Sequence, residues 1–366
     1  MRIGIDARLY GRYSRGIGRY AQELIRHLEK LDASHEYVVF MNAEGASELN
    51  FKNKKWKKVV VDIPWYSFSE QFKLPKAIKK ENIDVMHFPH YNVPLFFNKP
   101  LIVTIHDLLL HRHPTSNAST RNKIFFYIKY LAYRIVFRHS IRRAGKIIAV
   151  SHFTKKEILS FYPSCSNTIE VIYEGVNLPA SKMHTSVVQN QLLYVGALYP
   201  HKMIKEAIIT IYPLLVSHNA TLVLVGREDY FHKKLKLFLE KLSYSRVVFK
   251  GEVSDSELES LYDESKALLY PSVYEGFGLP PLEALVSGCP VIAFESEAVK
   301  EVSGKYIKLY KKDVELKTLI DEVLNYEKNV VTDSVFRELN QKYSWQDMAK
   351  NTESLYNIVH GDSGKS

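Results

Sequence analysis

The sequence predicts an α/β fold in which two doubly wound domains follow one another along the chain. Short apolar runs alternate with longer helical patterns from end to end, as in repeated βαβ units. Some runs are continuously apolar, such as Leu222–Val225, which is typical of parallel strands covered on both faces. A chain of 366 residues is also longer than one hydrophobic core usually supports.

The expected strands fall into two series. The first comprises Arg2–Asp6, Tyr37–Met41, Lys58–Asp62, Val85–Phe88, Leu101–Ile105, Lys146–Val150 and Glu170–Tyr173. The second comprises Leu192–Val195, Thr221–Val225, Val247–Lys250, Ala267–Tyr270 and Pro290–Phe294. The polar segment Asn177–Asn190 lacks periodicity and is expected to link the two series. We therefore predict domains at 1–178 and 179–345, then a last helix within 346–366 that ends in a disordered tail from Gly361.

The amino-acid composition is that of an ordinary globular protein with an excess of basic over acidic residues. No apolar run approaches the length needed to cross a bilayer, and the first residues read as a strand instead of a signal peptide. The sequence has only two cysteines, Cys165 and Cys289, which excludes a disulfide framework and a four-cysteine metal site. These features predict a cytoplasmic protein, and the net charge of +10 indicates a polyanionic partner.

The positive charge gathers in one segment. No acidic residue occurs between Asp107 and Glu157, and a basic, aromatic-rich helical pattern runs over 121–143. Its basic residues include Arg121, Lys123, Lys129, Arg134, Arg138, Arg142 and Arg143. Such a helix suits an anionic membrane surface, so attachment to the inner face of the plasma membrane is one reading. A partly buried domain helix with a solvated basic face is the other.

The most specific motif follows the expected strand Ala267–Tyr270. A loop with Gly276 and Gly278 leads into a helix, whose N-terminus suits the diphosphate of a nucleotide. Glu275 lies on this loop and Glu283 lies within the helix. Carboxylates beside a phosphate site are poor phosphate ligands, but they accept hydrogen bonds well from sugar hydroxyls.

This string, Glu-Gly-Phe-Gly-Leu-Pro-Pro-Leu-Glu-Ala, resembles the family 4 glycosyltransferases, which are retaining enzymes of the GT-B fold. In that fold, two Rossmann-like domains face each other across a cleft. The string is most similar to the mannosyl- and rhamnosyltransferase branch. The resemblance implies that Glu275 and the backbone amides of Gly276, Phe277, Gly278 and Leu279 hold the donor sugar. It also implies that Glu283 binds the ribose of the nucleotide.

Two further segments resemble parts of the same family. The resemblance of Tyr194–Lys202 implies that Lys202 contacts the diphosphate and stabilises the leaving group. His201 stands where family members often carry arginine, so we assign it to the donor site as well. Gly16 and Gly18 lie in a segment that resembles the glycine-containing loop opening the family's first helix, which faces donor phosphates or acceptor.

Histidines follow two expected strands of the first half. The resemblance implies that His106 touches the donor sugar near the reacting centre, although a structural bond to Asp107 would also explain it. His87 and His90 are expected to shape the acceptor site instead of binding metal. No metal site or cofactor is expected, since helix dipole and basic side chains stabilise the diphosphate in this fold.

These observations predict a retaining glycosyltransferase of cell-surface polysaccharide synthesis. It would move a hexosyl or deoxyhexosyl group from a nucleotide sugar, with GDP-mannose as the first guess, to a glycan or lipid-linked acceptor. An epimerase or a phosphorylase of the same fold is the alternative. A nucleic-acid binder fits the charge but leaves Glu275 and Glu283 unexplained. Gly16–Ala21 matches a dinucleotide pattern, yet it begins ten residues after the first strand, which argues against NAD.

Overall fold

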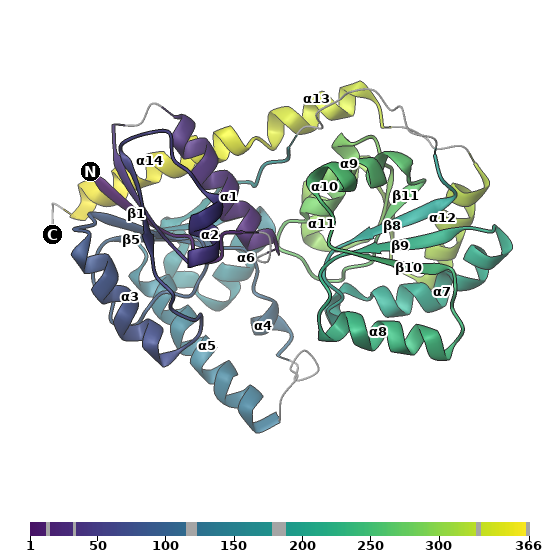
Figure 1. Cartoon of the computed structure of the whole chain (residues 1–366), viewed down its shortest axis with the longest axis horizontal. Coiled ribbons are helices and arrows are strands. Elements are labelled where there is room, and N and C mark those ends of the chain that lie inside the picture. The colour runs from purple at the N-terminus through teal and green to yellow at the C-terminus, as the bar shows by residue number, and fades with distance from the viewer. Residues whose placement is uncertain (12–14, 32–33, 115–122, 178–187, 327–330, 364–366) are drawn as a thin grey trace. The chain divides into compact units, whose positions relative to one another are not determined.

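In the computed structural model, the described residues are 1–11, 15–31, 34–114, 123–177, 188–326 and 331–363. The chain divides into two compact units (Figure 1). Unit 1 comprises Met1–Pro114, Arg121–Gly175 and Ser344–Ser366, and unit 2 comprises Thr115–Thr120 and Val176–Tyr343. Residues 178–187 of the expected linker lie outside the described part of the chain.

Unit 1 is built on a seven-stranded sheet with the order β3-β2-β1-β4-β5-β6-β7, and all its strand pairs are parallel. The strands are β1 (Arg2–Asp6), β2 (Glu36–Met41), β3 (Trp56–Val60), β4 (Val85–Phe88), β5 (Leu101–Ile105), β6 (Lys146–Ala149) and β7 (Ile169–Val171). β1, β4 and β5 have the bounds that the apolar runs predict. β3 begins two residues before its predicted start. It is an edge strand in which only Trp56 is buried, so its apolar signal is weak.

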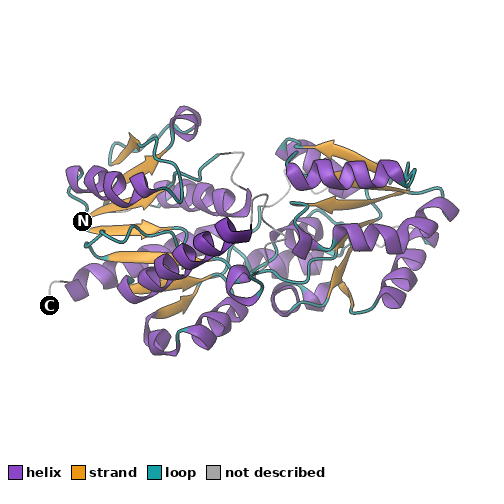
Figure 2. Ribbon diagram, turned by 90° about the horizontal axis from the view of Figure 1, so that it is seen from below, coloured by secondary structure: helices purple, strands orange, loops and turns teal. Residues whose placement is uncertain are grey.

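Helices cover the strands of each unit (Figure 2). Those of unit 1 are α1 (Arg15–Lys30), α2 (Ala43–Glu48), α3 (Phe68–Lys80), α4 (Leu109–Arg112), α5 (Lys123–Arg143), α6 (His152–Phe161) and α14 (Trp345–Ser363), with the 3-10 helix η3 (Pro163–Thr168). Ser67 and Ser151 cap the N-termini of α3 and α6, since each side chain accepts a hydrogen bond from a backbone N–H of the first turn. α1 begins at Arg15, so Gly16 and Gly18 lie in its first turn and not in a loop ahead of it.

The core of unit 1 forms where the apolar strands meet the helices. Phe40, Phe88, Val103 and Phe137 are at most 1% exposed and belong to one cluster that spans the sheet and α5. Because the middle strands are covered on both faces, their sequences are continuously apolar. The buried core holds the sheet in place, and the loops at the carboxyl edge of the sheet are where a ligand would bind.

Unit 2 repeats the plan with a six-stranded parallel sheet of order β10-β9-β8-β11-β12-β13. Its strands are β8 (Gln191–Val195), β9 (Thr221–Val225), β10 (Val247–Gly251), β11 (Ala267–Tyr270), β12 (Val291–Phe294) and β13 (Lys308–Tyr310). β13 was not among the expected strands. It has three residues and begins with an exposed lysine, so it lacks the apolar run that marks the others.

The helices of unit 2 are α7 (Ile204–Ser217), α8 (Tyr230–Lys241), α9 (Asp255–Glu264), α10 (Leu279–Val286), α11 (Glu297–Val302), α12 (Asp313–Asn325) and α13 (Asp333–Lys342). Two short 3-10 helices, η4 (Pro200–Lys202) and η5 (Gly304–Tyr306), complete the unit. Its core packs Leu222, Leu224, Leu269 and Ile292 of the sheet against α7 and α12.

The last helix, α14, belongs to unit 1, where it packs against α1, β4 and β5. Its first residue packs closely on Gly175, where a Cβ atom would lie 2.2 Å from the backbone nitrogen of Trp345. Further along, the Tyr356 hydroxyl is 2.7 Å from His87 Nδ1. The helix continues through Ser363, so the disordered tail predicted from Gly361 is wrong for residues 361–363, and 364–366 lie outside the described residues.

Candidate functional site

In unit 2, the predicted donor residues gather at the carboxyl edge of the sheet. Lys202 ends η4 in the connection that follows β8, and Glu275 lies in the loop that follows β11. β8 and β11 are neighbours in the sheet although they are not consecutive in the chain. The strand order reverses at this pair, and such a switch point is where open α/β sheets bind ligands.

The Lys202 ammonium and the Glu275 carboxylate form an ion pair through Oε1. The Tyr270 hydroxyl donates to the same oxygen at 2.6 Å, from the last residue of β11. Burial alone would raise the pKa of Glu275, but the Lys202 charge and these hydrogen bonds together hold the pKa below its usual value. Both side chains stay partly accessible, with 17% exposure for Lys202 and 14% for Glu275. The pair is therefore a charged, ordered group that a ligand can still reach.

The two loops that carry this pair are tied together through their backbones. The carbonyl of His201 accepts a hydrogen bond from the backbone N–H of Val273 at 3.1 Å. The His201 ring is half-buried and stacks on Tyr199, with 5.9 Å between ring centroids. His201 thus joins the η4 turn to the glutamate loop, and its backbone serves that purpose whatever its ring binds.

The glycine loop leads into α10 through Gly278, whose φ of +102° is unfavourable for residues with a Cβ atom. Phe277 is 4% exposed and packs edge-on against Tyr343, so its side chain anchors the loop and only its backbone could meet a ligand. Leu279 is the first residue of α10. Within the helix, Glu283 is half-buried, and the Tyr262 hydroxyl lies 3.3 Å from its Oε2.

In unit 1, His106 follows β5 at the carboxyl edge of the sheet. Its Nδ1 is 3.0 Å from Glu174 Oε1, and its Nε2 is 3.0 Å from the Pro89 carbonyl. These two contacts engage both ring nitrogens of His106 and fix the orientation of its ring. Asp107, the partner considered from the sequence, accepts from the Leu109 backbone N–H at 2.9 Å.

The two other histidines of this edge differ from each other. His87 is fully buried, with Nδ1 facing the Tyr356 hydroxyl and Nε2 at 2.9 Å from Thr104 Oγ1. Its prediction as an acceptor-site residue is wrong, because both ring nitrogens are used inside the core. His90 is 9% exposed, and its Nδ1 has no hydrogen-bond partner. Burial, helped by the nearby His106, lowers the pKa of each to about 3.

The first turn of α1 carries the two glycines predicted for the donor site. Gly16 is exposed, and a Cβ atom there would meet nothing within 4 Å, whereas Gly18 is buried. Two residues later, the Tyr20 ring packs edge-on against His106 with 4.9 Å between centroids. The Tyr20 hydroxyl also lies 3.1 Å from Thr104 Oγ1. α1 therefore approaches His106 through Tyr20.

Tyr270, Tyr262 and Glu174 are the contacts that sequence reasoning missed. Tyr270 was read as the end of a buried strand, and nothing in its pattern shows that its hydroxyl meets Glu275. Glu174 lies 68 residues from His106 in the chain, and this spacing gives no sign of their contact. Within the described ranges, no group of three or more His, Cys, Asp or Glu side chains is arranged to hold a metal ion.

Comparison with known proteins gives a consistent picture of the family. Residues 14–179 match the model described as Glycosyltransferase Family 4, and residues 183–338 match the model described as Glycosyl transferases group 1. The chain belongs to glycosyltransferase family 4. The resemblance predicted from the Glu275–Glu283 string is thereby confirmed. This family 4 glycosyltransferase carries the string inside the second match and His106 inside the first.

A curated relative of this glycosyltransferase is the O-antigen chain mannosyltransferase RfbU of Salmonella typhimurium. The two are 32% identical over 238 residues, which cover 65% of this chain and 64% of that relative. The chain's match thus spans somewhat under two thirds of the relative's length.

Two solved structures show the fold. Sucrose-phosphate synthase from Thermosynechococcus elongatus superposes with a TM-score of 0.76 at 17% identity, covering 99% of this chain and 100% of that chain. HepE of Anabaena, solved in complex with UDP and glucose, gives a TM-score of 0.73 at 16% identity, covering 98% and 100%. These likenesses confirm the GT-B fold class.

Proposed function

We propose that this glycosyltransferase moves a hexosyl or deoxyhexosyl group from a nucleotide sugar to a glycan or lipid-linked acceptor in cell-surface polysaccharide synthesis. The observation that carries the proposal is the Lys202–Glu275–Tyr270 group at the switch point of the second sheet. In this proposal unit 2, which includes Val176–Tyr343, binds the donor. Unit 1, with the returning last helix, binds the acceptor.

Each group of the donor site has a distinct role in this proposal. The Lys202 ammonium offsets the negative charge that grows on the departing diphosphate. The Glu275 carboxylate accepts hydrogen bonds from the sugar hydroxyls, aided by the backbone of the glycine loop. Glu283, on α10, accepts from the ribose hydroxyls. Because Lys202 is already paired with Glu275, a bound donor would share this cation between diphosphate and carboxylate.

GDP-mannose is the donor that we propose first, and the name of the mannosyltransferase RfbU supports this choice. HepE, solved with UDP and glucose, supports a nucleotide-sugar site in general, and it makes UDP-sugars the first alternative to test. The transfer would retain the anomeric configuration. In a front-face substitution, the departing diphosphate takes the proton of the acceptor hydroxyl while an oxocarbenium-like sugar lies between them. His106 is the residue that we propose for the contact near the reacting centre, where its Nε2 would exchange the Pro89 carbonyl for a sugar oxygen.

A screen of nucleotide sugars by thermal stabilisation tests the donor assignment. A ligand at about a hundred times its dissociation constant adds roughly 2.7 kcal/mol to the free energy of unfolding. We expect GDP-mannose to stabilise the protein more than GDP-glucose, UDP-glucose or ADP-glucose. Stabilisation by none of these would contradict the donor proposal. An epimerase would convert the stabilising donor without acceptor, and a phosphorylase would release sugar phosphate in inorganic phosphate.

We also propose that α5 holds the enzyme reversibly on an anionic membrane at the cytoplasmic side. Along one stripe of this helix, Ile128, Leu131 and Ile135 are 50–63% exposed, and the stripe continues into exposed Arg138 and Arg142. Exposed apolar side chains beside basic ones suit the boundary between headgroups and acyl chains. No described helix is long and apolar enough to cross a membrane.

The burial of α5 bears on the choice between a membrane helix and an ordinary domain helix. In an ordinary domain helix, Ile128, Leu131 and Ile135 would belong to the buried side. Instead the aromatic side faces the core, with Phe126 at 8% and Phe137 at 0% exposure. A lipid-linked acceptor would be presented at such a surface.

A further inference from the structure

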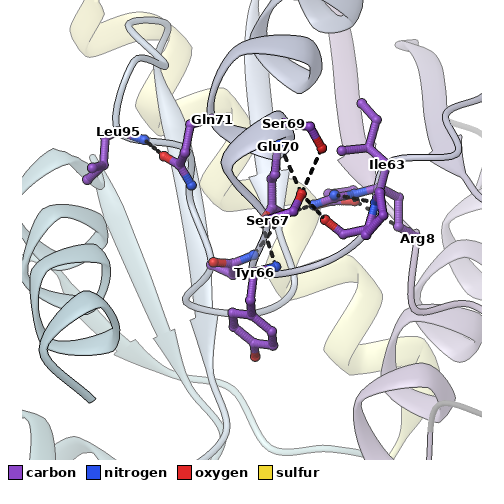
Figure 3. A network of polar contacts seen from close by, with 11 residues as sticks. Arg8, Ile63, Tyr66, Ser67, Ser69, Glu70, Gln71 and Leu95 are labelled. Carbon is purple, nitrogen blue, oxygen red and sulfur yellow. Dashed lines mark hydrogen bonds and ion pairs between the residues drawn. The ribbon is translucent and has the colours of Figure 1, made fainter. Parts of the chain in front are cut away.

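A buried ionic network in unit 1 is not explained by His106 or by the donor site. Arg8 Nε and Nη2 donate to Asp6 Oδ1 and Oδ2 at 2.8 and 2.7 Å, and Nη2 also donates to Glu70 Oε1 at 2.6 Å (Figure 3). All three side chains are at most 1% exposed. Buried charges are costly and persist only when their geometry is well satisfied. Two carboxylates around one guanidinium therefore mark a region that the fold keeps rigid.

This network fixes the backbone at Tyr66. Glu70 Oε2 accepts the Tyr66 N–H at 2.9 Å, and Asn92 Nδ2 donates to Glu70 Oε1 at 2.7 Å. Tyr66 has a φ of +57°, a left-handed conformation that is unfavourable for a bulky side chain. Its ring points away from the network (Figure 3), and the residue is 60% exposed. An exposed aromatic held in a strained backbone by buried charges is typical of a binding residue.

Three other rings join Tyr66 in a group that we call the aromatic platform, made of Trp65, Tyr66, His90 and Tyr91. Trp65 contacts the Arg8 guanidinium, 4.5 Å from the ring centroid, and meets His90 edge-on at 5.7 Å. The Tyr66 and Tyr91 hydroxyls are 3.1 Å apart, and the His90 and Tyr91 centroids are 3.9 Å apart. Its residues follow β3 and β4, at the carboxyl edge where His106 follows β5.

The platform holds two buried polar atoms without a hydrogen-bond partner, Trp65 Nε1 and His90 Nδ1. Orphaned buried polar groups are rare, since each forfeits the hydrogen bonds that it had in water. Trp65 Nε1 can only donate. The lowered pKa of His90 keeps its ring neutral near pH 7, so Nδ1 can accept when the proton is on Nε2. One donor and one acceptor beside aromatic faces match the hydroxyls and the C–H face of a sugar ring.

We propose that the aromatic platform binds a pyranose ring of the acceptor glycan. Tyr66 would stack on the sugar, and rotation of the neighbouring side chains would bring Trp65 Nε1 and His90 Nδ1, which are buried here, to two of its hydroxyls. This inference rests on the proposed glycosyl transfer, because it assigns the acceptor subsite of that reaction. A neutral sugar fits better than a phosphate, since Asp6 and Glu70 outnumber Arg8 in the network behind the platform.

Steady-state kinetics of Tyr66→Gly test the stacking. Glycine adopts a positive φ without strain, and this gain offsets part of the entropy that glycine adds to the unfolded chain, so we expect the variant to lose the ring with only a small change in Tm. We expect KM for the acceptor to rise about 3- to 10-fold, the usual range for one aromatic contact, with KM for the donor unchanged. Tyr326→Gly is the matched control, because Tyr326 is also a surface tyrosine, at 68% exposure, and lies in unit 2. An unchanged acceptor KM in Tyr66→Gly would overturn the inference.

A binding measurement separates this inference from the proposed function. Methyl α-mannoside and methyl α-glucoside, titrated to high millimolar concentration, should change tryptophan fluorescence saturably in the wild type and not in Trp65→Phe. Trp56 and Trp345 are 6% and 4% exposed, which leaves Trp65 as the reporter. A response to GDP instead of either glycoside would make the platform a nucleotide site and overturn the inference. Absence of transfer with every nucleotide sugar, combined with saturable glycoside binding, would sink the proposed reaction and leave the sugar subsite standing.

Discussion

The carboxyl edges of the two sheets offer a comparison within one molecule. When the strands are numbered within each sheet, both sheets have the order 3-2-1-4-5-6 over their first six strands. In each sheet, the loops at the carboxyl edge carry charged, polar or aromatic side chains that could bind a ligand. In unit 2 these are an accessible lysine–glutamate pair beside a glycine loop. In unit 1 they are a histidine–glutamate pair, neutral buried histidines and exposed aromatics. The shared topology sets where ligands bind, and the loop residues set which ligand chemistry each unit can accept.

The largest effect that we expect comes from the donor carboxylates of unit 2. Glu275→Gln should lower kcat/KM by about 10³-fold or more, since the proposed contact to the sugar is lost beside a developing charge. Its affinity for GDP should persist. Glu283→Gln should instead weaken GDP binding itself, because its proposed partner is the ribose. Calorimetric titration of both variants with GDP separates the roles, and an equal loss of affinity in both would contradict the assignment.

Next in size is the loss of the cation. Lys202→Ala should reduce kcat by about two to three orders of magnitude, the usual scale for removing one group that stabilises transition-state charge. His201→Ala is the neighbouring control, and we expect it to lose less, because its backbone carbonyl keeps the contact to Val273. Transfer should also continue in EDTA. Strict dependence on an added divalent metal, or a Lys202→Ala turnover within a few fold of the wild type, would refute the assigned role.

A smaller, salt-dependent effect is expected from α5 of unit 1. Arg138→Glu with Arg142→Glu should release the protein from anionic liposomes, since each basic residue near such a surface contributes on the order of 1 kcal/mol. Turnover of a short, lipid-free acceptor should be unchanged. Lys233→Glu with Lys236→Glu, on exposed positions of α8 in unit 2, is the matched charge control. Sedimentation must be compared at one near-physiological salt concentration, because salt screens the attraction. Wild-type protein that stays in the supernatant would leave α5 as an ordinary domain helix.

The last expected effect concerns acid stability in place of activity or binding, and it should differ between the two units. The pKa of His87 and that of His90 fall from 6.5 to about 3 on folding, so the unfolded state gains protons first as the pH drops. Each should therefore destabilise unit 1 progressively as the pH falls below about 6.5 toward about 3. The pKa of Glu275 is lowered instead, so its stabilisation of unit 2 is complete above about pH 4.3 and fades below it.

Hydrogen exchange measures this difference directly. Between about pH 6.5 and 4.5, and after correction for intrinsic exchange rates, peptides from β4 should lose protection while peptides from β11 keep theirs. His87→Gln and His90→Gln should flatten the response of β4. Equal loss of protection in both strands would show that acid destabilises the chain as a whole and not through the unit 1 histidines.

The sequence by itself determined the fold class, the family and most strands. Continuous apolar runs identify buried parallel strands because both faces of a central strand need cover, and β1, β4, β5, β9 and β11 match their predicted bounds. The glycine loop between Glu275 and Glu283 was recognisable because its residues are close together in the chain. The sequence did not predict β13, because a short strand at the edge of a sheet needs few apolar residues.

Only the tertiary structure decided which distant side chains meet. Lys202 and Glu275 are 73 residues apart, His106 and Glu174 are 68 apart, and Arg8 and Glu70 are 62 apart. No local pattern records these pairs, because their contacts arise where parallel strands bring the ends of separate loops to one edge of a sheet. The sequence also leaves the orientation of α5 undecided, because apolar and aromatic side chains occur on several faces of this helix. Its orientation was set by the fit of Phe137 into the core, which left Leu131 and Ile135 outside.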